Sequence, residues 1–398
     1  MHRRIFLKQT GLGLGGLVAG QRLTAMHHPP ELIKVAIIGC GDRGKGIIHI
    51  LKSMPQNFQI TAICDVLTSK ITQAKKMDQS GLWQAYQDFD KMLRVEKLDA
   101  VVVAVPLHLH YPIAVAAILK GLHLYLEKTM TYSIDQSLNL VRLMENRKGQ
   151  ILQVGHQYRY SPLYYKVKDM IDKGYLGKIT QLDCRWDRNG DWRRPVEDRK
   201  LERVINWRMY KAYSGGLVAE LLSHQIDFIN WLFDVHPDQF SASGGIDIYA
   251  DGRETFDNVQ VMLRYSNLGL IGNFGATCGN AYDGYLFKIK GTKGTLSLLT
   301  DEGIFYPEKK AVVKRATVDG VSGASEITWD KNGGTPILPE KTKDGTWYAF
   351  EDFHRRILDG TQPDSNVITG ARTAISVHLA NEALYDQKIV LWPSELNF

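Results

Sequence analysis

A glycine-rich turn between a buried strand and a helix constrains this chain more than any other feature. The run 32–38 is rich in β-branched residues and predicts a buried parallel strand. It leads into Gly39-Cys40-Gly41-Asp42-Arg43-Gly44, a G-x-G-x-x-G motif, and then into helical sequence that ends near Met54. A second predicted strand ends at Asp65. This succession of strand, glycines, helix and acid predicts a dinucleotide-binding unit.

Each part of the motif has a physical task in this interpretation. Gly39 permits the tight turn, Gly41 lets the backbone approach a pyrophosphate, and Gly44 lets the helix pack closely on the strand. The helix N-terminus presents free N–H groups to the phosphates. Asp65 accepts hydrogen bonds from the adenosine ribose and repels a 2′-phosphate, so NAD is favoured over NADP. The alternative is a glycine turn in an unrelated α/β fold.

Strand-like and helix-like stretches alternate as far as residue 155. The further predicted strands are 98–105, 123–127 and 151–154, and the predicted helices are 111–120 and 134–147. Alternation of this kind predicts a doubly wound parallel sheet, a Rossmann domain, over residues 31–155. Ligands bind such sheets at the carboxyl ends of the strands.

Near residue 178 the sequence pattern changes from alternating strands and helices to short strands separated by tight turns. The candidate strands are 179–186, 239–249, 258–265, 269–276, 286–291 and 294–299, with a helix over 216–233. This pattern predicts a mostly antiparallel sheet in an α+β domain that spans 156–369. Residues 307–345 are expected to loop over the surface, and residues 370–387 to form a helix that packs back on the first domain.

Residues 1–26 have the composition of an export signal. They contain Arg3 and Arg4, a glycine-rich apolar run at 11–20, and no acidic residue. The arginine pair resembles a twin-arginine signal and predicts delivery to the periplasm, with a disordered basic tail as the alternative. The apolar run is too short for a membrane anchor. Without this segment the net charge falls from +6 to +2, too small to predict a nucleic-acid partner.

Four features follow one another in a fixed order from about Lys34 to the C-terminus. They are the glycine motif, Ala104-Val105-Pro106 with His110 downstream, Glu127-Lys128 at a strand end, and Gly215-Gly216 followed by Glu220-x-x-x-His224-x-x-Asp227. Together they resemble the Gfo/Idh/MocA family of oxidoreductases. The resemblance implies an open, mostly antiparallel sheet as the second domain. It also implies a homo-oligomer, a dimer or tetramer, packed through the sheet face that needs cover.

Two positions depart from the pattern of that family. Thr129 stands where the family usually has proline after Glu-Lys, and Glu220 stands where it usually has aspartate. Both changes keep the reactive groups, although glutamate is one methylene longer. One branch of the family comprises NAD-dependent glycosidases, and its Tyr-Pro-Thr-His sequence does not occur here.

The carboxyl ends of the predicted strands and the family resemblance together indicate which residues bind the cofactor. These are Gly39, Gly41, Asp42, Arg43, Gly44, Asp65, Pro106, His110, Glu127, Lys128 and Gln157. Oxidation of an alcohol needs a base that takes the hydroxyl proton while hydride leaves carbon. Lys128 is the candidate base, provided that a desolvated, positively charged setting lowers its pKa. A surface lysine is the alternative.

Glu220 and His224 complete the predicted catalytic group. They are four residues apart, so we expect both on one helix face, with Glu220 orienting His224 and His224 relaying the proton or holding a substrate hydroxyl. A buried capping pair is the alternative. A metal is not expected, because no third ligand has suitable spacing and the four cysteines are scattered.

Aromatic and polar side chains in the second domain favour a carbohydrate-like substrate. The predicted substrate-binding residues are His156, Arg159, Trp207, Tyr210 and His224. Aromatic faces beside hydrogen-bonding groups suit sugar rings, although tryptophans are also common in cores.

Three functions are compatible with this pattern. The first is a dehydrogenase of a sugar, glycoside or cyclitol that holds NAD tightly, since free NAD should be scarce outside the cytoplasm. The second is a redox-neutral glycosidase or epimerase that oxidises its substrate transiently. The third, a non-catalytic NAD sensor, is disfavoured because Lys128, Glu220 and His224 are all present.

Overall fold

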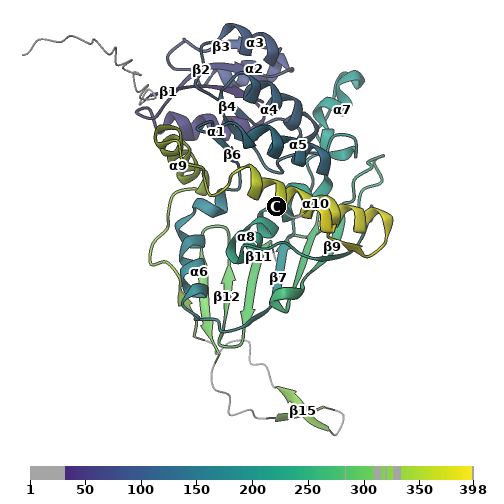
Figure 1. Cartoon of the computed structure of the whole chain (residues 1–398). Coiled ribbons are helices and arrows are strands. Elements are labelled where there is room, and N and C mark those ends of the chain that lie inside the picture. Colours follow the sequence, from purple (N-terminus) through teal and green to yellow (C-terminus); the bar gives the residue numbers. More distant parts are fainter. Residues whose placement is uncertain (1–31, 283, 309–314, 319–320, 326–332, 397–398) are drawn as a thin grey trace, which may run out of the picture.

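The computed structural model describes residues 32–282, 284–308, 315–318, 321–325 and 333–396. The export signal predicted at 1–26 lies outside these ranges. Within them the chain forms two sheet domains, one above the other in Figure 1, with the long helix α10 (Val367–Asp386) between them. No helix in the described ranges is long and apolar enough to cross a membrane.

The first domain is a fully parallel sheet. In the described part of the chain it has six strands in the order β3-β2-β1-β4-β5-β6. These are β1 (Ile33–Ile38), β2 (Phe58–Cys64), β3 (Gln84–Tyr86), β4 (Ala100–Val103), β5 (His123–Leu126) and β6 (Leu152–Val154). The predicted doubly wound sheet is confirmed. The strand order reverses between β1 and β4, which places a ligand crevice beside the glycine motif.

Helices cover both faces of this sheet, which explains its β-branched strands. They are α1 (Asp42–Lys52), α2 (Thr68–Lys75), α3 (Phe89–Val95), α4 (His110–Leu119), α5 (Ile134–Glu145) and, from the far end of the chain, α9 (Gly345–Asp359). Helices α1 and α9 pack on the face that carries Ile33 and Ile37, and α4 and α5 pack on the opposite face.

The second domain is a mostly antiparallel sheet, as predicted. Among the described residues it has nine strands in the order β16-β13-β12-β11-β7-β10-β9-β8-β17, and only β7 and β10 pair in parallel. The strands are β7 (Ile179–Trp186), β8 (Gln239–Gly245), β9 (Asn258–Tyr265), β10 (Leu270–Thr277), β11 (Tyr285–Gly291), β12 (Gly294–Leu298), β13 (Gly303–Pro307), β16 (Thr335–Pro336) and β17 (Val390–Leu391).

The expected surface loop over 307–345 is only partly correct. Strands β14 (Arg315–Val318) and β15 (Val321–Ser325) form a two-stranded ribbon within it, and β16 joins the main sheet. Residues 309–314, 319–320 and 326–332 lie outside the described ranges.

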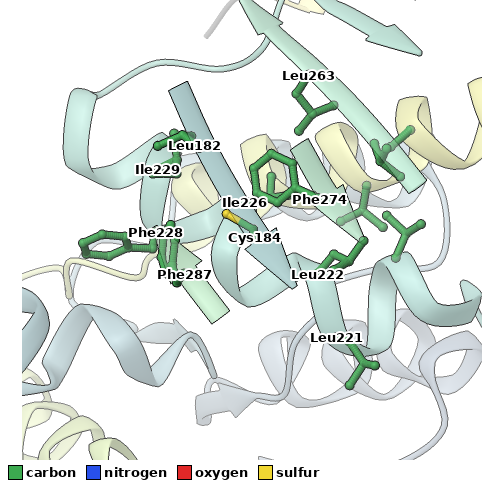
Figure 2. Packing of buried hydrophobic residues seen from close by; sticks show 14 of the residues in the cluster. Leu182, Cys184, Leu221, Leu222, Ile226, Phe228, Ile229, Leu263, Phe274 and Phe287 are labelled. Atoms are coloured by element: carbon green, nitrogen blue, oxygen red, sulfur yellow. The ribbon is translucent and has the colours of Figure 1, made fainter. Parts of the chain in front are cut away.

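One face of the second sheet packs on helix α8 (Ser223–Phe233), as Figure 2 shows. Side chains of α8 such as Phe228 and Ile229 meet Leu182 of β7 and Phe287 of β11 in one buried cluster. The opposite face carries polar residues at the alternate positions of β7, namely Gln181, Asp183 and Arg185. Ile271 and Leu286 lie on the same face beside Gln181 and Arg185, so this face mixes polar and apolar side chains. The expected homo-oligomer stays a prediction.

The helix predicted over 216–233 contains an irregular turn. Residues Val218–Leu222 form a π-helix, and α8 begins directly after it at Ser223. A π-helix pairs residues five apart instead of four, so the side chains around Glu220 do not follow the α-helical spacing that the sequence analysis assumed.

A buried ion pair fixes the connection between the two domains to α8. Arg159 lies in the short 3₁₀ turn Gln157–Tyr160 between β6 and α6 (Pro162–Asp172), and it donates two hydrogen bonds to Asp227 of α8, at 2.8 and 2.9 Å. Thr373 of α10 donates a third, at 2.8 Å. Burial opposes ionisation of Asp227, but Arg159 and His156 outweigh that effect and lower the pKa of its carboxyl.

We predict that Arg159→Ala destabilises the protein by about 3–5 kcal/mol, because it leaves the Asp227 carboxylate buried without its main counter-charge. Denaturant unfolding followed by circular dichroism measures the loss. Lys173→Ala is the matched control: Lys173 pairs with Asp169 on the surface, so its removal should leave the unfolding midpoint unchanged. Equal midpoints for Arg159→Ala and the wild type would show that the buried pair does not hold the domains.

Candidate active site

The glycine motif closes tightly on the first sheet but leaves one side open. Gly39 has a φ of +98°, and a Cβ there would overlap the carbonyl oxygen of Ala104. A Cβ on Gly44 would overlap the carbonyl oxygen of Gly39, whereas a Cβ on Gly41 would meet nothing within 4 Å. Two glycines therefore allow close packing, and the third faces free space at the N-terminus of α1. This arrangement fits the pyrophosphate of a dinucleotide.

Asp65 lies beside this loop at the end of β2. Its carboxylate accepts the Cys40 N–H at 2.8 Å and the Leu67 N–H at 2.9 Å, one on each oxygen. A carboxylate oxygen can accept more than one hydrogen bond, so the group is fixed in place and can still accept a ribose hydroxyl. This is the position that its predicted role requires.

Arg43 and Glu127, both predicted to bind the cofactor, bind each other. Arg43 Nε donates to Glu127 Oε1 at 2.8 Å, and Arg43 Nη1 donates to the Thr346 hydroxyl at 3.2 Å. The pair ties the first turn of α1 to the end of β5 and to α9. Asp42, one residue earlier, pairs with Arg194 of the second domain, with 2.8 Å between Oδ2 and Nη2.

His110, which is predicted to contact the cofactor, also contacts two backbone carbonyl groups. Downstream of Pro106 it is buried, and its ring nitrogens lie 2.9 Å from the Thr129 carbonyl oxygen and 3.0 Å from that of Val105. Burial lowers the pKa of His110, although both carbonyls favour the charged ring. The ring therefore holds the turn that carries Lys128 against the end of β4.

Lys128 reaches from the end of β5 into the second domain. Its Nζ donates to the carbonyl oxygen of Glu220 at 2.6 Å and to that of Ala219 at 3.3 Å. Thr129, joined to Lys128 by a cis peptide bond, donates its hydroxyl to the same Ala219 carbonyl at 3.2 Å. Burial is the main cause that lowers the pKa of Lys128, and Arg208 and Arg43 add to it against the opposing effect of the acids Glu220 and Glu127.

Glu220 does not orient His224 as expected. Its carboxylate accepts Arg208 Nε at 2.8 Å, so it is bound by a residue outside its own helix. Burial opposes ionisation of Glu220, but Arg208 and then Lys128 outweigh that effect and lower its pKa. Arg208 lies over the Trp207 ring, 4.2 Å from its centroid, so Trp207 supports this ion pair.

His224 is a buried, neutral imidazole. Burial lowers its pKa well below the usual value, and the charge of Lys128 adds to this effect. The ring lies 5.2 Å from that of Tyr158 and 5.5 Å from that of Trp186. Its Nδ1 is buried and has no hydrogen-bond partner among the described residues. A polar atom in that situation is available to a substrate hydroxyl.

Among the other predicted substrate-binding residues, His156 is a neutral imidazole, whereas Arg159 and Tyr210 are bonded to acidic side chains. His156 Nδ1 lies 3.1 Å from Asp227 Oδ1, and burial lowers the pKa of His156 to about 4, so it is neutral like His224. Arg159 gives both Nε and Nη2 to Asp227, and therefore supports the site from behind instead of meeting a substrate. Tyr210 donates its hydroxyl to Glu202 at 3.0 Å, in the segment that leads to Arg208.

Gln157 supplies a second unpaired polar atom. Its Oε1 is buried and has no partner among the described residues. Gln157 follows His156 at the carboxyl end of β6, on the crevice side of the first sheet. An acceptor at this place fits the carboxamide of a nicotinamide ring, in agreement with the predicted cofactor contact.

The described ranges contain neither a metal site nor a disulfide. No cluster of three or more His, Cys, Asp or Glu side chains that could hold a metal ion occurs there. All four cysteines lie within those ranges, and each is buried and unpaired.

Sequence reasoning did not single out two residues of the site. Asp227 was visible only as part of the motif with His224, although it pairs with Arg159 and lies 3.1 Å from His156 Nδ1. Arg208, which forms an ion pair with the Glu220 carboxylate, does not belong to a recognisable sequence motif. Its neighbour Trp207 was among the predicted substrate-binding residues. The position of an arginine next to that aromatic residue was the signal that could have indicated Arg208.

Comparison with solved structures supports the two-domain architecture. A levoglucosan dehydrogenase in complex with NADH and levoglucosan aligns with a TM-score of 0.73 over 91% of this chain and 100% of that chain, at 19% identity. A myo-inositol 2-dehydrogenase from Lactobacillus plantarum aligns with a TM-score of 0.68 over 91% of this chain and 99% of that chain, at 21% identity. At these identities the likeness shows a common fold.

Curated relatives match over about half of their length. An inositol 2-dehydrogenase/D-chiro-inositol 3-dehydrogenase of Lactiplantibacillus plantarum is 28% identical over 204 residues, 51% of this chain and 53% of the relative. A glycosyl hydrolase family 109 protein of Shewanella amazonensis is 28% identical over 205 residues, 48% of this chain and 45% of the relative.

Two family models match consecutive parts of the chain. The model described as "Oxidoreductase family, NAD-binding Rossmann fold" covers residues 33–156, and the GFO/IDH/MocA C-terminal domain covers residues 164–297. Together they span more than half of the chain. The chain therefore belongs to the GFO/IDH/MocA family of oxidoreductases, and its first domain is the NAD-binding Rossmann domain of that family.

Proposed function

We propose that this protein is an exported NAD-dependent dehydrogenase that oxidises a hydroxyl group of a sugar, glycoside or cyclitol. The observation that carries the proposal is the amine of Lys128, which has a lowered pKa and lies at the carboxyl end of β5 between the NAD-binding domain and the second domain. The matched inositol dehydrogenase and the structurally similar levoglucosan dehydrogenase support a polyhydroxylated substrate.

Lys128 acts as the base in this proposal. A neutral amine has two N–H bonds and one lone pair, and both N–H bonds have acceptors in the carbonyls of Ala219 and Glu220. The lone pair then points to the remaining direction, where a substrate hydroxyl can give up its proton. NAD, when bound, supplies the acceptor for the hydride that the alcohol carbon loses.

Arg208 and His224 affect the protonation of Lys128 without accepting the substrate proton themselves. Arg208 neutralises the Glu220 carboxylate, which would otherwise favour the ammonium form of Lys128. His224 offers its unpaired Nδ1 to the substrate as a hydrogen-bonding group, and its neutrality avoids a second charge beside Lys128. The arrangement favours loss of a proton from a hydroxyl at this point.

A redox-neutral reaction is the second candidate. The match to a glycosyl hydrolase family 109 protein supports it, and so does the proposed export, because an exported enzyme that returns its hydride needs no external acceptor. In this version the same Lys128 removes and later returns the proton. The sugar, glycoside or cyclitol class of substrate is common to both candidates.

Single-turnover reduction of bound NAD⁺ with a panel of sugars, glycosides and cyclitols tests the proposal. We expect the absorbance of NADH to rise with at least one member and an oxidised product to appear by mass spectrometry. If the absorbance rises and decays without added acceptor while a cleaved or epimerised product forms, the redox-neutral candidate replaces net oxidation. No absorbance change and no product with any member would contradict both.

We predict that Lys128→Ala lowers turnover about 10²–10⁴-fold, because a positioned acid/base group contributes that much, while NAD binding persists. Lys128→Arg should lose as much, since it keeps the charge but offers no base near neutral pH. In the wild type, oxidation should rise with pH through the Lys128 pKa, below that of free lysine, because only the neutral amine accepts a proton.

The exposed Lys120, on the same domain, provides the control for these variants. Lys120→Ala should turn over like the wild type. Fluorescence titration with NADH checks that each variant still binds the cofactor. If Lys128→Ala reduces its NAD⁺ at the wild-type rate, Lys128 is structural and the proposed mechanism is wrong.

Export is proposed from the composition of residues 1–26, and the twin-arginine route from Arg3 and Arg4. Changing both to lysine should leave the full-length protein in the cytoplasm with its N-terminal segment uncleaved, because the twin-arginine signal depends on the arginine pair. Cell fractionation with immunoblotting measures the distribution. Unchanged delivery to the periplasm would contradict the proposed route, and the wild type remaining in the cytoplasm would contradict export itself.

A further inference from the structure

One segment of the second domain crosses to the first. It connects β7 to the π-helix, and it includes the short helix α7 (Glu202–Ile205), which stands beside the first domain in Figure 1. An ion pair and a hydrogen bond are among the contacts that join the segment to the first domain, beside the ring contact of Tyr213 with His108. Arg194 Nη2 lies 2.8 Å from Asp42 Oδ2, and Tyr132 donates its hydroxyl to the Lys211 carbonyl oxygen at 2.5 Å.

Arg194 is held at this crossing by a buried side chain. Asn206, which is 2% exposed, accepts the Arg194 N–H at 2.8 Å and donates to the Arg194 carbonyl oxygen at 2.9 Å. Asn206 also donates to Glu202 at 3.1 Å. A buried amide that binds both backbone groups of one residue fixes that residue in position and direction.

Ion pairs hold the frame around Asn206 in turn. Arg193 pairs with Glu202 and with Asp251, each at 2.8 Å, and Arg253, which is nearly fully buried, pairs with Asp251. The backbone on either side of Arg194 is therefore fixed, whereas its guanidinium is exposed and extends to the glycine motif.

The charge at the end of Arg194 is placed where the cofactor phosphates bind. Asp42 is the first residue of α1, directly after Gly41, whose Cβ position is open. An acid at the N-terminus of this helix repels a pyrophosphate unless a cation offsets it. Arg194 at 2.8 Å and Lys45 at 3.4 Å supply such cations, and only Arg194 comes from the other domain.

We propose that Arg194 binds the pyrophosphate of NAD across the gap between the domains and slows its release. A guanidinium can bond Asp42 and a phosphate oxygen together because it has five N–H donors in a planar fork. The second domain would then close on the cofactor through one charged side chain. The inference rests on NAD binding by the first domain and is independent of the substrate.

The test uses the full-length protein and three ligands. The release rate of NADH is measured by stopped-flow fluorescence after a chase with excess NAD⁺, and the affinities for ADP and adenosine by calorimetry. Arg194→Ala should release NADH about tenfold faster or more and bind ADP correspondingly more weakly, because it loses a charge-assisted bond to a phosphate. Its affinity for adenosine, which has no phosphate, should equal that of the wild type. Arg199→Ala, an exposed arginine of the same segment, is the matched control and should match the wild type throughout.

Asp42→Asn separates the proposal from a simple tie between domains. It frees Arg194 and removes a negative charge beside the phosphates, so NADH release should be slower than in the wild type or unchanged. Release as fast as in Arg194→Ala would mean that the ion pair alone holds the domains and would overturn the proposal. Wild-type release by Arg194→Ala, or an equal loss of adenosine affinity, would overturn it as well. A wild type that binds neither NADH nor ADP would overturn the cofactor assignment together with this inference.

Discussion

The site depends on one contact between the domains, the bonds from the Lys128 amine to the carbonyl oxygens of Ala219 and Glu220. Lys128 ends a strand of the first sheet, and its two acceptors lie in the π-helix before α8. The Ala219 carbonyl also accepts the hydroxyls of Thr129 and Ser223. These few hydrogen bonds hold the candidate base at the carboxyl end of the NAD-binding sheet and in contact with the second domain.

The charges around that contact are arranged to keep the amine reactive. Arg208 pairs with the Glu220 carboxylate and Arg43 with that of Glu127, so both arginines offset the acids that favour the ammonium form of Lys128, and burial lowers its pKa. Burial makes both nearby imidazoles, His224 and His156, neutral. A lysine whose anions are already neutralised by arginines gives up its proton more easily than one in water.

Local sequence patterns predicted much of the fold. Long β-branched runs and the glycine motif identified β1, β2 and most strands of the second sheet, because each contains enough residues for its periodicity to be recognised. Strands β3, β16 and β17 have two or three residues each, too few to show a pattern. Helix α9 was not recognised, although Asp344 caps its N-terminus by accepting the Thr346 N–H.

The candidate site was predictable only where its residues belong to a local motif. Lys128 and the glycines were found because they follow strands. Arg208 and Arg194 were not, because their partners are determined by tertiary folding: Arg194 and Asp42 are 152 residues apart. The expected pairing of Glu220 with His224 was wrong because Arg208 binds the Glu220 carboxylate, and only tertiary folding brings these two residues together.

That π-helix makes the length of the segment before His224 matter more than its composition. A π-helix turns less per residue than an α-helix, so the five residues 218–222 advance the helix about as far as four α-helical residues would. Deleting one of them and restoring regular spacing would therefore leave the flanking residues nearly in place. The change would fall on the carbonyls of Ala219 and Glu220, each of which a regular α-helix bonds to the N–H four residues on, so that Lys128 would have less free acceptors.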